Sequence, residues 1–322
     1  MRLVRFRQHD FDRTGLLLDG GVIDLVSVLS DDPDVTPYER DACRDTVSLI
    51  ALGDRGLELM ARAAGARCLR RRVEEVTLLA PIAPRLILCS GENYWDHREE
   101  KPVVEGKEPE FFLKNPLGVI ATGESIQLDT RVTRKLDYEA ELLIVIGKPG
   151  RHIPESEALD HVFGFSIMND VTARDRQVKL RPDGTSAYSL GPGKSFDTCA
   201  PIGPCIVTRD EIGDPQGLAI RTYVNRELRQ DNNTGKMIWN VAQLVAFFST
   251  YITLRPGVVI STGTPGGTGW GSDAELGARA NGRKLEGSVS RYLGAGDEVV
   301  CEIEGIGELR NRVAVAPAGA SA

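Results

Sequence analysis

From about residue 85 onward, the chain alternates short apolar, β-branched segments with turns rich in glycine and proline. Such segments are typical of β-strands. One clear helical pattern, over residues 238–252, interrupts the series. A βαβ fold needs a helix between successive parallel strands, and most of these connections carry no helical pattern. The sequence therefore predicts an α+β fold that is mostly β with some α, in which the sheet closes into a barrel or roll.

The N-terminal part of the chain has a different pattern. Two strand-like segments flank Gly20 and Gly21, and apolar residues at three- and four-residue spacing follow over residues 48–66. The paired glycines predict a tight turn, and the spacing predicts a helix. Prolines then punctuate the chain just beyond residue 80. We therefore expect three parts, which are a small N-terminal α/β domain (1–80), a catalytic domain (81–316) and a flexible tail (317–322).

The composition excludes several classes of protein. The 322 residues carry a net charge of −7 and a pI of about 5.3, unlike the basic surface of a nucleic-acid-binding protein. The six cysteines form no C-x-x-C pair, which indicates reduced thiols and disfavours a zinc cluster. The N-terminus lacks the apolar stretch of a signal peptide, and the most apolar run, residues 142–146, is too short to span a bilayer. We therefore expect a cytoplasmic protein that has neither nucleic acid nor a membrane as a partner.

The segment LDYEAELLIVIG, residues 136–147, predicts a strand because its second half is apolar and β-branched. Residues i and i+2 of a strand share a face, so Glu139 and Glu141 should project side by side. Two buried carboxylates repel each other unless a cation lies between them or one holds a proton. Oxygen ligands of this kind suit hard ions such as Mg²⁺, Mn²⁺ or Ca²⁺. A solvated strand edge is the alternative, but the apolar run that follows favours a strand that enters the core.

A third acid, Asp170, ends the apolar segment of residues 163–170. Thr172 followed by Asp175 resembles a capping box, so we expect a helix to begin near Thr172. Asp170 would then lie where a strand gives way to a helix, a frequent place for functional groups on a rigid scaffold. A structural turn aspartate is the alternative. Together with the two glutamates, Asp170 predicts a divalent-metal site.

His97 and Glu100 are three residues apart, so a helical turn would place them on one face. A carboxylate that is hydrogen-bonded to an imidazole raises the basicity of the imidazole. A general base that takes a proton from water needs this higher basicity. An ordinary histidine on an exposed, charged helix is the alternative. The surrounding charged segment, residues 98–110, contains a glycine and would suit a mobile cover over a site.

Two glycine-rich stretches carry polar anchors. Residues 191–198 lack P-loop spacing, but they present Lys194 to an anionic substrate or to an acid beside a metal. Residues 261–271 offer backbone N–H groups and Thr264 to an oxyanion or a carboxylate. A plain surface turn is the alternative for these stretches. Lys114 is a weaker candidate, because a lysine at a strand end is usually solvated.

Taken in order, several segments resemble the fumarylacetoacetate hydrolase family, in particular its longer members with a small N-terminal domain. The matching segments are GENYWDHREE, FFLKNP, LDYEAELLIVIG, FGFSIMNDVTARDRQ, GPGKSFDT, GTPGGTG and GDEVVCEIEGIGELRN. The resemblance implies a catalytic domain with a mixed β-roll, assembled as a homodimer. It also implies a Mg²⁺ or Mn²⁺ site whose ligands match Glu139, Glu141 and Asp170.

The resemblance also implies roles for other residues. Lys194 matches a lysine near the metal, and His97 with Glu100 matches the dyad of members that activate water from a lid. The residues expected to contact the substrate are Arg174, Gln177, Tyr94 and Thr264, the last through a substrate carboxylate. The chain departs from the family's pattern at Glu92, where members often carry an apolar residue, and over residues 270–292, a longer stretch that we expect to border the site.

These roles imply a metal-dependent hydrolase that cleaves a C–C bond in a β-diketo acid, either an acylpyruvate or a fumarylacetoacetate-like acid, and releases an oxo-acid such as pyruvate. The metal would act as a Lewis acid, and Glu100 would orient His97 as the base that takes a proton from water. One alternative is a lyase or isomerase on the same scaffold: a 2-oxo acid decarboxylase, a dienoate hydratase or isomerase, or a 2-keto-3-deoxy sugar-acid dehydratase. The other is a non-catalytic binding protein, which the joint presence of acids, lysine and dyad disfavours.

Overall fold

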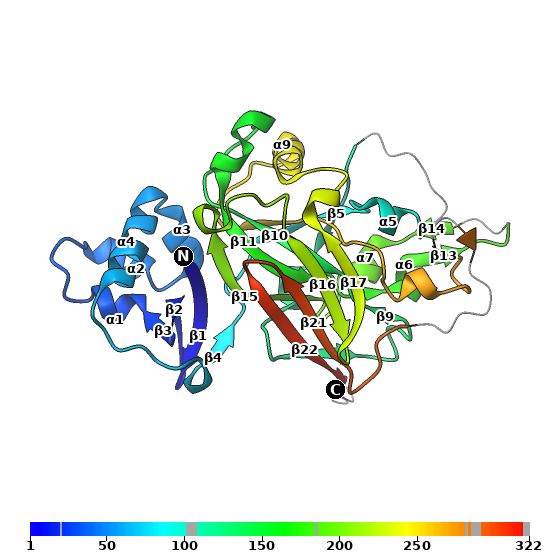
Figure 1. Ribbon diagram of the computed structural model, residues 1–322, viewed down its shortest axis with the longest axis horizontal. Helices are drawn as coiled ribbons and strands as arrows, with labels where there is room; N and C mark the ends of the chain where they lie inside the picture. The colour runs from blue at the N-terminus through cyan, green and yellow to red at the C-terminus, as the bar shows by residue number, and fades with distance from the viewer. Residues whose placement is uncertain (20, 101–107, 184–185, 281–282, 285–290, 318–322) are drawn as a thin grey trace, which may run out of the picture.

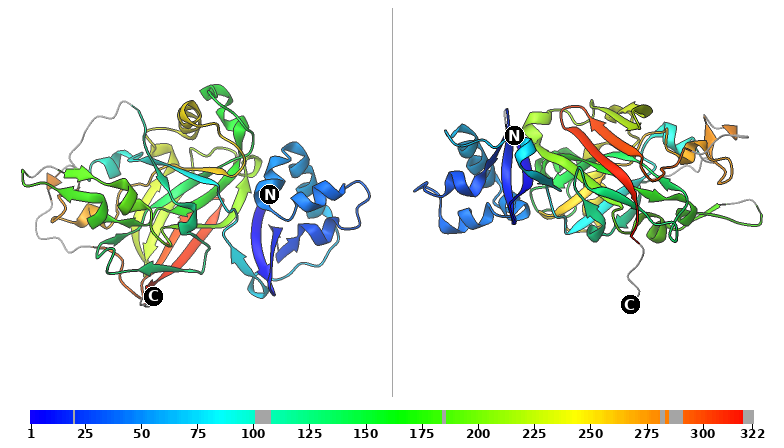
Figure 2. Two further views of the ribbon diagram at one scale, coloured as in Figure 1. Left: turned by 180° about the vertical axis from the view of Figure 1, so that it is seen from behind. Right: turned by 90° about the horizontal axis from the view of Figure 1, so that it is seen from below.

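The computed structural model describes residues 1–19, 21–100, 108–183, 186–280, 283–284 and 291–317. Figures 1 and 2 show the N-terminal part at one end of the molecule, beside a larger part built around two sheets. Within this described part, no helix is long and apolar enough to cross a membrane. Residues 101–107 of the expected cover and residues 318–322 of the expected tail lie outside the described ranges.

The largest sheet has 11 strands in the order β3-β2-β1-β15-β11-β10-β18-β5-β6, with β4 also paired to β1 and β7 to β15. Its strands are β1 (Arg2–Gln8), β2 (Phe11–Leu18), β3 (Gly21–Asp24), β4 (Thr77–Leu79), β5 (Leu86–Gly91), β6 (Glu110–Lys114), β7 (Val119–Ile120), β10 (Ala140–Ile146), β11 (Val162–Asn169), β15 (Ala200–Thr208) and β18 (Val258–Ser261). The second sheet has the order β17-β16-β21-β22-β8. Its strands are β8 (Ser125–Leu128), β16 (Ala219–Val224), β17 (Glu227–Asn233), β21 (Glu298–Ile303) and β22 (Gly307–Val315).

Short strand pairs and helices surround the two sheets. The pairs join β9 (Leu136–Asp137) to β12 (Thr172–Ala173), β13 (Val178–Leu180) to β14 (Ser186–Tyr188), and β19 (Arg279–Ala280) to β20 (Arg283–Lys284). The helices are α1 (Leu25–Leu29), α2 (Pro37–Ala42), α3 (Thr46–Ala51), α4 (Asp54–Gly65), α5 (Trp95–Arg98), α6 (Arg174–Gln177), α7 (Leu190–Lys194), α8 (Arg209–Ile212) and α9 (Val241–Tyr251). The 3₁₀ turns are η1 (Val73–Glu75), η2 (Pro116–Gly118), η3 (Glu155–His161), η4 (Thr234–Lys236) and η5 (Trp270–Ser272). The mostly-β α+β fold predicted from the sequence is confirmed.

The N-terminal part joins the larger part through the sheet itself. Strand β1 pairs with β15, so the N-terminal strands extend the large sheet. The helix expected over residues 48–66 is divided into α3 and α4. Gly53, between them, has φ of 62°, a conformation that favours glycine and ends the first helix. The domain boundary at residue 80 stays a prediction.

Strand β10 is buried on both faces, which explains its unbroken apolar sequence. Leu142 and Ile144 belong to the core between the two sheets. Leu143 and Val145 belong to a second core, which the N-terminal helices share. Because side chains alternate along a strand, Glu141 projects on the same face as Leu143. The acidic site therefore lies on the face of the large sheet that points away from the core between the sheets.

The strand expected over residues 136–147 is interrupted. Strand β9 pairs with β12 and β10 pairs with β11, so the backbone changes partner around Tyr138. Glu139 lies in the gap between β9 and β10. Its carbonyl oxygen nevertheless accepts a hydrogen bond from the backbone N–H of Asp170 at 2.8 Å, so the two residues stay side by side.

Strand β6 forms one edge of the large sheet. Phe112 and Lys114 point inward and are buried, whereas Phe111 and Leu113 are 38% and 47% exposed. The Phe111 ring lies 5.6 Å from that of Phe248 on α9, so this edge and the helix share an apolar surface. The edge thus carries one buried charge and an exposed apolar face.

Candidate metal centre and active site

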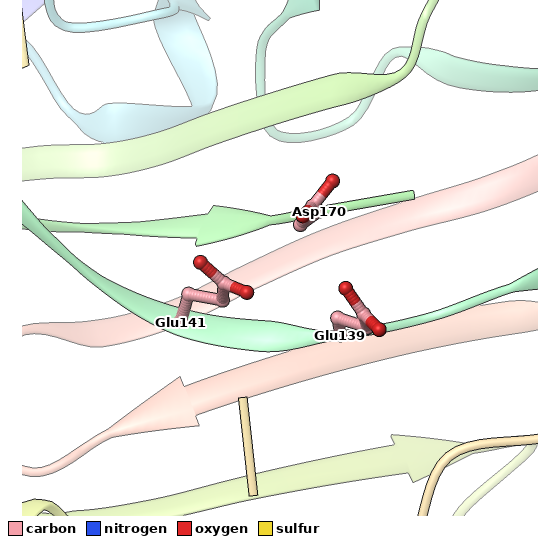
Figure 3. Close-up of side chains that lie close together, drawn as sticks. All are labelled: Glu139, Glu141 and Asp170. Atoms are coloured by element: carbon pink, nitrogen blue, oxygen red, sulfur yellow. The ribbon is translucent and has the colours of Figure 1, made fainter. Parts of the chain in front are cut away.

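Three carboxylates meet beside β10 and the end of β11. Figure 3 shows Glu139 and Glu141 rising from neighbouring positions of one segment, with Asp170 beside them, and all three are buried. One carboxylate oxygen from each lies within 4.8 Å of the others. Ligands on opposite sides of a single Mg²⁺, Mn²⁺ or Ca²⁺ ion are about 4 to 5 Å apart. The predicted convergence of the three acids is confirmed, and their oxygen-only donor set fits a hard divalent ion.

Among the described residues, no lysine or arginine forms an ion pair with Glu141, in contrast to Glu139 and Asp170. Its Oε2 accepts hydrogen bonds from Ser261 Oγ at 2.5 Å and from the Gly263 N–H at 3.1 Å. Burial, and then the charges of Asp170 and Glu139, raise the pKa of its carboxyl to about 8. A bound cation would supply the missing countercharge, so the electrostatics of Glu141 also fit a metal.

Each carboxylate oxygen of Asp170 accepts a hydrogen bond from a different lysine. Lys194 donates to Oδ2 at 2.7 Å and to Oε2 of Glu139 at 2.5 Å. Lys114 donates to Oδ1 of Asp170 and, at 3.1 Å, to the carbonyl oxygen of Val171. The expectation that Lys114 is a solvated strand-end lysine is wrong, because β6 turns it inward beneath the acids. Lys194 lies at the end of helix α7 and not in an open loop.

The pKa shifts of these groups follow from their contacts. Burial opposes ionisation of Glu139, but the charges of Arg174 and then Lys194 outweigh it and lower the Glu139 pKa. Burial likewise disfavours the charged form of Lys194, but Asp170 and Glu139 outweigh it and raise the Lys194 pKa. Glu139 is therefore an anion and Lys194 a cation at neutral pH.

The segment after Asp170 differs from the expected capping box. Thr172 lies in β12, and its hydroxyl donates to the carbonyl oxygen of Asp170 at 2.8 Å. Helix α6 begins one residue after Ala173, which caps it without a side-chain bond. The Asp175 carboxylate instead accepts a hydrogen bond from Thr133. Pairing with β9 holds this segment extended, which is why the local capping pattern does not decide where the helix begins.

The predicted contact between His97 and Glu100 is confirmed. Nδ1 of His97 lies 2.7 Å from Oε2 of Glu100, and both side chains are buried. Glu100 also accepts hydrogen bonds from the Gly267 N–H at 2.7 Å and from the Thr268 hydroxyl at 3.0 Å. The other ring nitrogen of His97, Nε2, lies 3.9 Å from Oε1 of Glu139. The pair therefore faces the acid cluster, with Glu100 held in place from behind.

The protonation of His97 is set by opposing effects. Burial disfavours the imidazolium, but the hydrogen bond and charge of Glu100, followed by the charge of Glu139, outweigh it and raise the His97 pKa. A raised pKa makes the neutral ring a stronger base.

Arg174 and Gln177 both line the cavity beside the acids, as expected for residues that face a substrate. Arg174 donates to Oε1 of Gln177 at 2.8 Å, to Oδ2 of Asp137 at 2.7 Å, and to Glu139. The guanidinium group is therefore fixed in position before any ligand binds.

Asp137 is a residue that the sequence analysis missed. It is fully buried, and besides Arg174 it accepts hydrogen bonds from the backbone N–H groups of Gly269 at 2.7 Å and Trp270 at 2.9 Å. It ties the glycine-rich stretch to α6. Its position two residues before Glu139 was the available signal, because the alternation extends to D-x-E-x-E.

Of the other two expected substrate contacts, Thr264 lies at the cavity and Tyr94 does not. Thr264 lines the cavity, but its hydroxyl donates to the Ala140 carbonyl at 2.9 Å and accepts from Gln230 at 2.8 Å. Tyr94 belongs to the core between the sheets and is absent from the cavity lining. Its placement gives no support to the expected contact with substrate.

The cavity at this site is small, about 30 Å³, which leaves room for roughly one water molecule. It is enclosed by acids, by basic and polar groups, and by apolar side chains. Its lining residues are Ser90, Gly91, Glu92, His97, Glu110, Phe112, Glu139, Glu141, Asp170, Arg174, Gln177, Tyr188, Leu190, Lys194, Thr264 and Trp270. A larger ligand must therefore displace side chains as it enters.

This site and fold define a class of protein. The family profile described as "Fumarylacetoacetate (FAA) hydrolase C-terminal" matches residues 86–314, and the chain belongs to that family of enzymes. Among relatives, "Oxaloacetate tautomerase fahd2, mitochondrial" of Xenopus laevis is 37% identical over 318 residues, covering 97% of this chain and 90% of the relative.

Two solved structures extend the comparison. A fumarylacetoacetate hydrolase from Exiguobacterium antarcticum has a TM-score of 0.76 and 34% identity, covering 98% of this chain and 100% of that chain. A maleylpyruvate hydrolase from Sphingobium sp. SYK-6, solved with manganese(II) and pyruvate, has a TM-score of 0.73 and 27% identity with the same coverage. The manganese in that relative and the buried Glu–Glu–Asp cluster here together indicate divalent-metal binding.

Proposed function

We propose that this protein is a metal-dependent hydrolase that cleaves a C–C bond in a β-diketo acid of the acylpyruvate type and releases an oxo-acid such as pyruvate. The observation that carries the proposal is the His97–Glu100 hydrogen bond beside the three acids. Hydrolysis needs a base that can take a proton from water, and the dyad supplies one next to a metal site.

Glu139, Glu141 and Asp170 are the residues that would hold the ion, with Mg²⁺ or Mn²⁺ preferred and Ca²⁺ possible from the donor set. When bound, a divalent ion supplies Lewis acidity and positive charge to the oxygens of a 2-oxo acid. These chemical properties suit the cleavage of a bond next to a keto acid.

The proton transfer follows from the geometry of the dyad. With its proton on Nδ1, His97 donates to Glu100 and leaves the Nε2 lone pair for a water proton. Water gives that proton to Nε2, and its oxygen attacks the distal carbonyl of the diketo acid. The negative charge of Glu100 stabilises the imidazolium that results. Bonds from Gly267 and Thr268 keep Glu100 from turning away.

Cleavage of the C–C bond leaves its electron pair on the pyruvate part as an enolate. Lys194 and Arg174 bring positive charge to the wall of the cavity where that part would bind. Such fixed charges favour the transition state over the ground state because negative charge grows next to them as the bond breaks. His97 then returns its proton to the carbon of the enolate.

A second candidate is oxaloacetate tautomerisation, favoured by the name of the Xenopus relative. In that reaction His97 would move a proton between carbon and oxygen of the oxo-acid without attack by water. Both candidates require a base at Nε2 and a stabilised enol.

The test is a panel of substrates with the Mg²⁺- or Mn²⁺-loaded protein. Loss of the diketo absorbance of acetylpyruvate, with pyruvate as a product, supports the hydrolase. Accelerated keto–enol exchange of oxaloacetate without pyruvate release from acylpyruvates would replace hydrolysis by tautomerisation. If neither substrate reacts and no other 2-oxo acid is turned over, the result would indicate a non-catalytic binding protein.

We further propose a homodimer and a cytoplasmic location. The exposed apolar edge formed by Phe111 and Leu113 supports self-association. Light scattering during size-exclusion chromatography should give twice the 35.1 kDa chain mass. A monomer at micromolar concentration would contradict the dimer.

A further inference from the structure

Trp270 lines the candidate site, and its indole carries a buried N–H donor. Trp270 is 3% exposed and lines the same cavity as the three acids. Its Nε1 has no hydrogen-bond partner within the described part of the chain. A buried donor without an acceptor is unfavourable, and native proteins retain few of them without a functional reason.

The position of this indole is fixed by its neighbours. The backbone N–H of Trp270 donates to Oδ2 of Asp137 at 2.9 Å. The guanidinium carbon of Arg174 lies 5.4 Å from the centroid of the ring, on which it packs as a cation–π partner. The ring meets His97 edge-on, with 6.2 Å between centroids. Trp270 is therefore held between the proposed base and the fixed guanidinium group.

The chemistry of the indole restricts what can bind there. Tryptophan Nε1 is a donor and cannot accept a hydrogen bond, so its missing partner must be an acceptor such as a carbonyl or carboxylate oxygen. The small cavity leaves space for about one water molecule, so an entering oxo-acid must move side chains. A substrate oxygen brought next to His97 in this way can give the N–H its acceptor.

We propose that Trp270 is a substrate-binding residue whose indole N–H donates a hydrogen bond to the substrate oxygen that lies next to His97. This inference rests on the proposed function, because it requires an oxo-acid to bind beside the dyad. During hydrolysis that oxygen is the one that gains negative charge when water attacks the distal carbonyl. A donor waiting there without a competing partner stabilises that charge. The donor also favours substrates whose distal group is a carbonyl over analogues that lack the oxygen.

The chain contains a matched control. Trp239 also has a buried Nε1 without a partner in the described ranges, but it does not line the cavity. Trp270→Phe and Trp239→Phe each remove one unpaired indole N–H and keep an aromatic ring. We expect Trp270→Phe to lower kcat/KM for acetylpyruvate by about tenfold or more, because a substrate oxygen loses its donor. Trp239→Phe should stay within about twofold of wild type, and both variants should bind Mn²⁺ as wild type does.

A second measurement observes the N–H directly. The protein carries three tryptophans, so ¹⁵N-labelled indole gives three side-chain resonances that single substitutions assign. In Mg²⁺-loaded His97→Gln protein, which lacks the proposed base, acetylpyruvate should shift the Trp270 resonance downfield and leave that of Trp239 unchanged. Binding of acetylpyruvate with no shift at Trp270 and an unchanged kcat/KM in Trp270→Phe would overturn the inference alone. Failure of wild type to bind or turn over any oxo-acid would overturn the proposed function, and the inference with it.

Discussion

The ammonium nitrogen of Lys194 lies 2.7 Å from Oδ2 of Asp170, so a positive charge of the chain touches one of the acids that would hold the metal. The same nitrogen lies 2.5 Å from Oε2 of Glu139. Lys194 thus supplies part of the countercharge that the buried acids need. A metal ion must therefore share these oxygens with the lysine or take its place beside them.

Lys194→Met should bind Mn²⁺ several-fold more tightly than wild type, because the ion no longer competes with an ammonium group for Glu139 and Asp170. Turnover should fall by about 100-fold, since a charge near the developing enolate is lost. Isothermal titration with Mn²⁺ and steady-state kinetics measure the two effects. Lys236→Met, which removes an exposed lysine, is the control. Weaker Mn²⁺ binding in Lys194→Met would show that the lysine assists the ion.

Glu141→Gln should make the metal-free protein more stable and weaken its binding of metal. The amide keeps the size of the side chain and removes a carboxyl whose pKa burial and the neighbouring acids raise to about 8. The metal-free variant should therefore melt at a higher temperature than metal-free wild type at pH 8. Stabilisation by Mn²⁺, which depends on binding to the folded state, should nearly vanish. Thermal melts with EDTA measure the melting temperature of the metal-free protein, and melts with Mn²⁺ measure the stabilisation by the metal. If Mn²⁺ stabilises the variant as fully as wild type, Glu141 is not a metal ligand.

The raised pKa of Glu141 also predicts a pH dependence. Between the ordinary value of 4.5 and about 8, the folded metal-free protein holds a proton that the unfolded chain has released. The free energy of unfolding contributed by this group should therefore fall as pH rises through that window and level off above it. Mn²⁺ affinity should rise over the same window, with release of a proton on binding.

Urea denaturation at several pH values measures how the free energy of unfolding changes as Glu141 ionises. Calorimetric titration with Mn²⁺, in buffers of different ionisation enthalpy, measures the metal affinity and the proton released on binding. Glu141→Gln should flatten both profiles. Proton uptake on Mn²⁺ binding would have the wrong sign for this account.

His97→Gln should lower turnover of acetylpyruvate by roughly 100- to 10,000-fold, the usual contribution of a general base. Mn²⁺ affinity should change little, because Nε2 lies 3.9 Å from Glu139 and is not among the proposed ligands. His161→Gln is a matched control, since His161 is also buried but bonds the Lys148 carbonyl outside the cavity. Full turnover in His97→Gln would exclude the dyad as the base.

Lys114→Met should destabilise the protein by about 3–5 kcal/mol, the usual effect of removing one partner of a buried ion pair. Lys114 is 2% exposed and its nitrogen contacts Oδ1 of Asp170, so the variant leaves a buried carboxylate with less countercharge. Urea denaturation of the metal-free protein measures the loss. Saturating Mn²⁺ should restore part of it. A loss below about 1 kcal/mol would be the value typical of an exposed pair and would contradict the buried environment.

Much of the candidate site follows from local rules. Alternation along a strand places Glu139 and Glu141 on one face, and three-residue spacing on a helical turn joins His97 to Glu100. Both rules depend only on backbone geometry over a few residues, so they hold wherever the segment lies in the fold. The strand end at Asp170 and the glycine-bounded loop at Lys194 made these two residues candidates from the sequence, the family resemblance linked them to the same metal site, and the structure brings them together.

The sequence by itself determined the mostly-β class, the acidic pair and the dyad, because these depend on periodicity and on neighbours close in the chain. The order of strands decided the rest. Lys114 is buried because β6 pairs with β5 and packs against α7, and Asp137 reaches Trp270 across 133 positions of sequence. Long-range pairing also set the division between β9 and β10 and the late start of α6. Burial and charge at a given residue depend on which distant segments cover it, and only the tertiary structure fixes that.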